Sequence, residues 1–90
     1  MSKWRRAAKI DANQPEIVKA LRKIPGVTVE LGMDDILVGY KGKTFWYEIK
    51  VSEKADVKPS QVKLNSDWRG HYKIVWSLEM ILKDAGISRS

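Results

Sequence analysis

Three charged residues are the strongest candidates for chemistry in this sequence: Asp35, Glu48 and Lys50. Residues 44–51 form an aromatic and β-branched run that is typical of a β-strand. Because side chains alternate along a strand, Trp46, Glu48 and Lys50 would share one face, with the carboxylate and the amine about 7 Å apart. The sequence therefore predicts an acid and a base side by side on one face of a sheet.

A short Lys-Gly-Lys turn at 41–43 brings in the third charged group. If its first two residues form the centre of the turn, Asp35 pairs with Glu48; if its last two do, Asp35 pairs with Lys50. One interpretation of either register is a solvated strand face with a cross-strand ion pair. The other is a phosphodiester hydrolase, in which two carboxylates hold a divalent cation and a neighbouring amine orients the attacking water or offsets developing charge.

Composition limits the alternatives. The chain has 90 residues, 43% of them hydrophobic, which predicts one small globular domain over residues 1–90. A net charge of +6 favours a polyanionic partner, most simply DNA. Cysteine is absent and His71 is the only histidine, so a metal site would consist of carboxylates around a hard cation. We expect no membrane association and a cytoplasmic location, because no apolar run approaches the roughly 20 residues that span a bilayer.

The remaining elements are predicted from periodicity and turns. A basic arm at 1–10 precedes a helix that Asn13 would cap and Pro25 would stop. Strands are expected at 27–31, 36–40, 44–51 and 72–76, a helix from Ser60 to Arg69, and a closing helix that Ser77 caps and that ends at Ala85 and Gly86. The order is helix, three strands, helix, strand, helix, which is an α/β domain with a mixed sheet.

Six short motifs follow one another along the chain: DANQPEIV at 11–18, LR at 21–22, GMDDILVG at 32–39, EIK at 48–50, SQ at 60–61 and WRG at 68–70. Their order and spacing resemble the virus-type replication–repair nucleases, the VRR-NUC branch of the PD-(D/E)xK superfamily. The resemblance implies a PD-(D/E)xK-like αβββαβ core, a mixed sheet flanked by helices, to which this chain adds a short C-terminal helix.

The resemblance also implies roles for individual residues. Asp35 and Glu48 would bind the metal, with the backbone carbonyl of Ile49 as a further ligand, and Lys50 would be the catalytic lysine. Glu16 matches the acidic residue of the first helix, which reaches the metal directly or through water. One position departs from the family, because Asp34 stands where proline usually precedes the aspartate, and Asp34 is therefore a competitor of Asp35.

Several side chains have a structural interpretation as well. Gln61 matches the glutamine that borders the site on the second helix, but it is also an ordinary first-turn residue, and Glu16 could complete a capping box with Asn13. We expect Trp68 and Trp76 in the core, and leave Trp4 and Trp46 open.

The sequence thus predicts a Mg²⁺- or Mn²⁺-dependent DNA endonuclease. Because so short a domain would gain stability and reach from a second copy, we expect a homodimer, whose two-fold axis would suit a Holliday junction. The resemblance to stand-alone family members likewise implies a resolvase that acts on branched DNA, in a bacterial or phage-infected cell. The alternative is a basic nucleic-acid-binding module without catalysis. Phosphate contacts are expected from basic residues that could equally serve solubility: Lys3, Arg5, Arg6, Lys9, Lys41, Lys43, Lys54 and Lys58.

Overall fold

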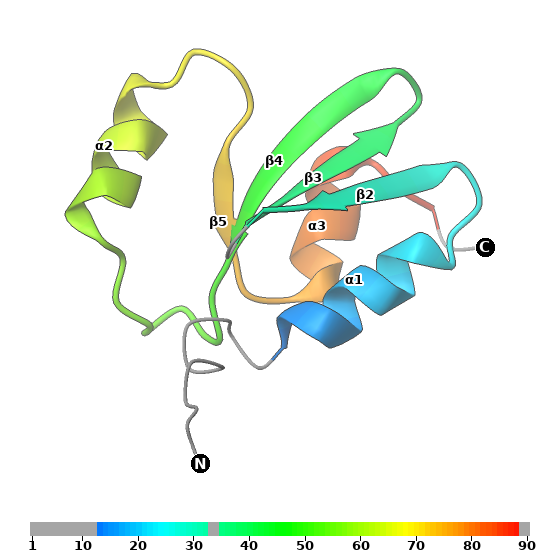
Figure 1. Ribbon diagram of the computed structural model, residues 1–90, viewed down its shortest axis with the longest axis horizontal. Helices are drawn as coiled ribbons and strands as arrows, with labels where there is room; N and C mark the ends of the chain where they lie inside the picture. The colour runs from blue at the N-terminus through cyan, green and yellow to red at the C-terminus, as the bar shows by residue number, and fades with distance from the viewer. Residues whose placement is uncertain (1–12, 33–34, 89–90) are drawn as a thin grey trace.

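The computed structural model describes residues 13–32 and 35–88, which form an α/β fold with one mixed sheet (Figure 1). The elements are α1 (Gln14–Arg22), β2 (Val27–Leu31), β3 (Asp35–Tyr40), β4 (Lys43–Ile49), α2 (Pro59–Asp67), β5 (Lys73–Val75) and α3 (Leu78–Ala85). The sheet order is β2-β3-β4-β5; β2, β3 and β4 pair antiparallel, and β5 runs parallel to β4. This confirms the predicted order of elements and the mixed sheet.

The turn between β3 and β4 decides the register that the sequence left open. Lys41 and Gly42 both have positive φ, 52° and 77°, as a two-residue type I′ turn requires. Glycine accepts this conformation without strain, so the second turn position is well suited to it. The resulting ladder pairs Asp35 directly with Glu48.

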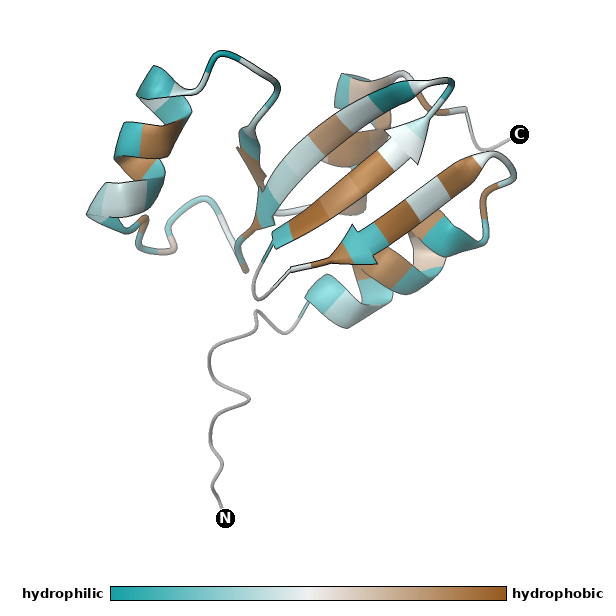
Figure 2. Cartoon of the chain, turned by 45° about the horizontal axis from the view of Figure 1, so that its top comes forward, coloured by the Kyte–Doolittle hydropathy of each residue, from teal (hydrophilic) through white to brown (hydrophobic). Residues whose placement is uncertain are grey.

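The hydrophobic core lies on one face of the sheet, under α1 and α3. Helix α1 buries four residues at i, i+3, i+4 and i+7, the spacing of one helix face: Gln14, Ile17, Val18 and Leu21. The three apolar ones pack with Ile36, Val38, Tyr47 and Ile49 from the sheet and with Ile81 from α3. Figure 2 shows the apolar stripes of the strands and of the two helices that form this layer.

The helix ends agree with the sequence only in part. Ser77 caps α3 by accepting a hydrogen bond from the Met80 N–H (3.2 Å), and Gly86 ends the helix in the left-handed conformation, both as predicted. In contrast, Asn13 makes no capping hydrogen bond to α1. Ser60 does not cap α2 either, because that helix begins one residue earlier, at Pro59. Proline is favoured at a first helical position, where its missing N–H costs nothing.

The two tryptophans expected in the core are partly exposed instead. Trp68 is 49% exposed and Trp76 is 37% exposed. Trp68 follows the last residue of α2, a helix in which Gln61 is the buried residue, and Trp76 follows β5, which ends at Val75. Each ring therefore lies just outside the element that was expected to bury it.

Three sequence predictions fall outside the described residues: the basic arm at 1–10, Trp4, and the competition between Asp34 and Asp35. Among the helices that the structure does describe, none is long and apolar enough to cross a membrane.

Candidate active site

The candidate residues gather at one end of the sheet. Asp35 is the first residue of β3, and Glu48 lies opposite it near the end of β4. Because β5 runs parallel to β4, the ends of both strands lie there too, and α1 begins beside them (Figure 1). Asp35, Glu48 and Lys50, which the sequence places on one side of the sheet, therefore lie close together, and the structure adds that they do so at one end of it.

Glu48 and Lys50 are buried, at 4% and 9% exposure, and form an ion pair with Nζ 3.7 Å from Oε2. A solvated strand face, one of the two interpretations of the sequence, is therefore not what the chain forms. Removing two charges from water is costly, and a buried ion pair is often no more stabilising than apolar side chains of similar volume. Stability alone therefore gives little reason for this pair.

The backbone of Lys50 is held on both sides. Its N–H donates to the Val75 carbonyl (2.8 Å), which extends the pairing of β4 with β5. Its carbonyl accepts from the side-chain amide of Asn13 (3.0 Å), which also donates to the Trp76 carbonyl (3.1 Å). Asn13 therefore ties the start of α1 to the ends of β4 and β5 through its side-chain NH₂, and its Oδ1 makes no capping bond to the helix.

Asp35 is half-buried and also held at several atoms. Its Oδ2 accepts a hydrogen bond from Nε1–H of Trp46 (2.7 Å), and its backbone carbonyl accepts one from the Gly32 N–H (2.8 Å). A Cβ atom at Gly32 would overlap the Asp35 carboxylate at Oδ1. The absence of a side chain at Gly32 thus leaves the space in which this carboxylate lies.

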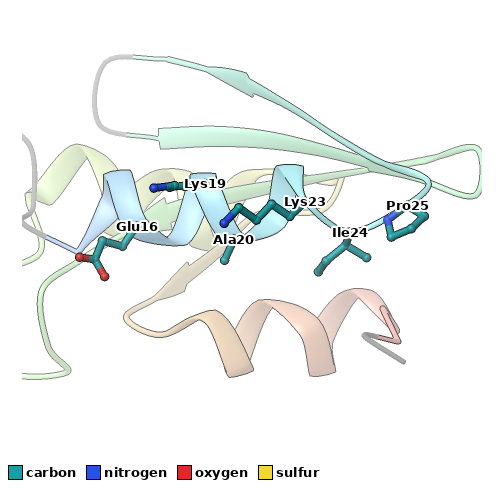
Figure 3. Close-up of a pocket in the computed structure, with 6 residues that line it drawn as sticks. All are labelled: Glu16, Lys19, Ala20, Lys23, Ile24 and Pro25. Atoms are coloured by element: carbon teal, nitrogen blue, oxygen red, sulfur yellow. The ribbon is translucent and has the colours of Figure 1, made fainter.

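Glu16 is not brought together with the other carboxylates. Its exposed side chain lies on α1 beside Lys19, Ala20 and Lys23, and it lines a pocket with them (Figure 3). Within residues 13–32 and 35–88, no three His, Cys, Asp or Glu side chains come close enough to hold a metal ion among themselves.

Gln14 is the residue of α1 that the sequence analysis missed. It is 5% exposed, and its Oε1 is buried without a hydrogen-bond partner. It lines a pocket with Leu31, the last residue of β2, whose strand partner Ile36 follows Asp35. A signal was available, since Gln14 precedes Ile17, Val18 and Leu21 by three, four and seven residues and so shares their face.

Gln61 is buried, as a residue bordering the site would be, but its observed contact is local. Its Oε1 accepts from the Lys58 N–H (3.1 Å), and its own N–H donates to the Lys58 carbonyl (2.9 Å). These bonds close the first turn of α2, so the structural interpretation of Gln61 is satisfied.

The side chain and the backbone carbonyl of Ile49 lie in different surroundings. Its side chain is in the core at 1% exposure. Its described strand partner is Val75, because the described β3–β4 ladder ends one residue earlier, at the pair of Asp35 and Glu48. The Ile49 carbonyl therefore belongs to the same sheet end as both carboxylates.

A second polar cluster lies on the opposite face of β4, around His71. The Trp46 backbone N–H donates to Nδ1 of His71 (3.0 Å), which leaves Nε2–H to donate to Asp84 Oδ2 (2.6 Å). The Tyr47 hydroxyl donates to the same oxygen (2.7 Å). His71 thus joins β4 to α3 and has a structural role.

This cluster moves two pKa values. Burial, followed by the hydrogen bond to Asp84 and its negative charge, raises the pKa of Tyr47 far above its ordinary value. Burial alone would raise the pKa of Asp84, but hydrogen bonds from Tyr47 and His71 and the charge of Lys73 outweigh it. The pKa of Asp84 therefore lies below its ordinary value.

Comparison with known proteins adds no relative: no family model, curated protein or solved structure matches this chain.

Proposed function

We propose that this protein is a metal-dependent DNA endonuclease with a PD-(D/E)xK-like core. The observation that carries the proposal is the buried pair of Glu48 and Lys50 directly across from Asp35. The order α1, β2, β3, β4, α2, β5 and the position of these residues in β3 and β4 support it.

The oxygen donors at this sheet end suit Mg²⁺ or Mn²⁺. Both ions accept carboxylate and carbonyl oxygens, and Mg²⁺ is commonly held by one or two protein carboxylates while it keeps several waters. Asp35 and Glu48 supply two carboxylates and Ile49 a main-chain carbonyl, and Gln14 has a buried amide oxygen without a protein partner. When bound, the ion would polarise the scissile phosphate and lower the pKa of a water.

The carboxylates and the ammonium of the site would have different roles. Asp35 and Glu48 hold the cation, and the Lys50 ammonium beside Glu48 orients the attacking water or stabilises charge that develops on the phosphate. Gln14 takes the role on α1 that the family resemblance suggested for Glu16, because its buried Oε1 lacks a protein partner and it follows Asn13, which bonds to the Lys50 carbonyl. Exposed basic residues, among them Lys41, Lys43, Lys54 and Lys58, would contact the DNA backbone.

The test is a cleavage panel of linear, flapped, forked and four-way-junction DNA with Mg²⁺, Mn²⁺ or EDTA. Wild type should cleave with either ion and not with EDTA. Lys50→Met should lose cleavage by about 100-fold or more, because the ammonium acts on the reacting groups. Lys63→Met is the matched control, since Lys63 is an exposed lysine of α2, and it should cleave like wild type.

Truncating one partner of a buried ion pair can itself destabilise a protein by about 3–5 kcal/mol. Thermal unfolding of Lys50→Met and of the double variant Glu48→Gln/Lys50→Met should therefore be measured alongside. A folded Lys50→Met variant with wild-type turnover in Mg²⁺ would refute the site assignment. DNA binding by wild type without Mn²⁺ binding and without cleavage would favour the alternative, a non-catalytic DNA-binding module.

A further inference from the structure

The two metal-binding carboxylates of the proposed site are not held in the same way. Glu48 is enclosed at 4% exposure beside Lys50. Asp35 lies at the start of β3 and is only half-buried, so packing restricts its carboxylate less. The hydrogen bond that fixes it comes from Nε1–H of Trp46, at 2.7 Å from Oδ2.

The Trp46 ring is itself fixed on several sides. Two aromatic rings pack against it in T-shaped contacts: the ring centroids of Trp68 and Tyr72 lie 5.5 Å and 4.8 Å away, with interplanar angles of 89° and 73°. Its backbone N–H donates to His71 Nδ1 (3.0 Å), two residues before the start of β5. With ring and backbone both held, the indole N–H has one direction, and that direction is toward Asp35.

We propose that Trp46 is the positioning residue of the metal site, which holds Asp35 Oδ2 so that Oδ1 is presented to the cation. The inference rests on the proposed nuclease function. Gly32 complements Trp46 from the other side, because a Cβ there would occupy the place of Oδ1. A carboxylate held before the cation arrives loses less conformational freedom on binding, and removing such an outer partner typically costs 10–100-fold in metal affinity.

The test measures metal binding in the absence of DNA. Titration calorimetry with Mn²⁺ should show about tenfold weaker binding to Trp46→Phe than to wild type, since phenylalanine keeps an aromatic ring but has no N–H. Trp76→Phe is the matched control, because Trp76 is also partly exposed but its side chain makes no described bond to Asp35, and it should bind Mn²⁺ like wild type. Gly32→Ala should weaken binding as Trp46→Phe does, with the Trp46 indole intact.

A second readout follows the indole directly. Adding Mg²⁺ to ¹⁵N-labelled wild type should shift one tryptophan side-chain N–H resonance in particular, the one that is missing from the Trp46→Phe spectrum. DNA affinity in EDTA should change less than twofold, since the change concerns the cation and not the phosphate contacts. Thermal unfolding identifies the folded variants to be compared.

The outcomes separate this inference from the function on which it rests. A folded Trp46→Phe that binds Mn²⁺ with wild-type affinity, while wild type binds and cleaves, would overturn the positioning role alone. Absence of Mn²⁺ binding by wild type would overturn both the proposed function and this inference.

Discussion

At the scale of single residues, burial distinguishes two polar side chains in the first turn of α1. Glu16 carries the charge expected of a metal ligand, but it points toward solvent beside Lys19 and Lys23 (Figure 3). Gln14 lacks the charge, but it is buried with its Oε1 unbonded by protein. A buried polar atom without a partner costs about 1–3 kcal/mol, so a bound ion or water at Gln14 would remove a real penalty.

The substitution Gln14→Glu tests this assignment. It exchanges a neutral oxygen for a charged one, and ligand charge raises the affinity for hard cations, so we expect about tenfold tighter Mn²⁺ binding by calorimetry. Without metal the same variant should unfold at lower urea concentration, because the new carboxylate is buried. Glu16→Gln is the control and should leave Mn²⁺ affinity within twofold. Equal effects of both substitutions would contradict the assignment of Gln14.

At the scale of elements, the network around Asp84 fastens α3 to the sheet. Tyr47 on β4 and His71 before β5 both donate to Asp84, and the Lys73 ammonium lies 3.6 Å from its second oxygen. The network lies on the opposite face of β4 from Glu48. It should therefore affect the stability of the fold and not the chemistry of the site.

Asp84→Asn should accordingly destabilise the protein by about 1–3 kcal/mol at neutral pH, measured by urea unfolding, because hydrogen bonds to a charged group are lost. The control Asp67→Asn removes an exposed i,i+4 pair with Lys63 and should cost less than about 0.5 kcal/mol. Cleavage at 25 °C should not change in either variant. A folded Asp84→Asn that loses cleavage would show that the network serves the site as well.

The same network gives a pH dependence of stability. Because the pKa of Asp84 is lower in the folded protein than in the unfolded chain, its ionised form stabilises the fold above the unfolded pKa. This contribution is lost as the pH falls through the folded pKa. The difference in unfolding free energy between wild type and Asp84→Asn should thus be full at pH 6 and shrink below about pH 4. A difference that stays constant down to pH 2 would contradict the assignment.

At the scale of the whole molecule, exposed apolar side chains gather on one part of the chain. Val51, Val57, Val62 and Trp68 are all exposed, and they belong to α2 and to the segments that flank it. Figure 1 shows α2 set apart from the layer of α1 and α3, beyond the β4–β5 edge. Exposed apolar groups of this kind often mark protein–protein contacts, and two-fold dimers are the commonest assemblies.

We therefore predict a homodimer that α2 helps to form. Light scattering should give twice the monomer mass at micromolar concentration, and Val62→Lys should shift the protein toward monomer because it places a charge on this surface. Leu37→Lys is the control at an exposed apolar residue of β3. Two sites related by a two-fold axis would also make a four-way junction a better substrate than linear duplex. A strict monomer, or equal cleavage of both substrates, would exclude the hypothesis that the protein is a junction resolvase. The proposal of a metal-dependent nuclease would not be affected.

The sequence by itself determined those structural features that depend on residues close together in the chain. Strand alternation put Glu48 and Lys50 on one face, and Ser77 and Gly86 marked the ends of α3, because these features need only a few consecutive residues. The choice between the two turns of the hairpin is local as well, but the residue types alone did not decide it. Two registers satisfied the pattern, and the positive φ of Lys41 together with Gly42 selected the one that pairs Asp35 with Glu48.

Tertiary structure alone decided which polar groups are buried and with whom. Asn13 is of a residue type that often caps helices, but its side chain bonds to the Lys50 and Trp76 carbonyls, far along the chain. Trp46 bonds to Asp35 on the neighbouring strand, and Trp68 contacts the Trp46 ring while it stays 49% exposed. Such contacts depend on how separate elements pack together in space. A short sequence pattern contains no information about which distant residues will become neighbours.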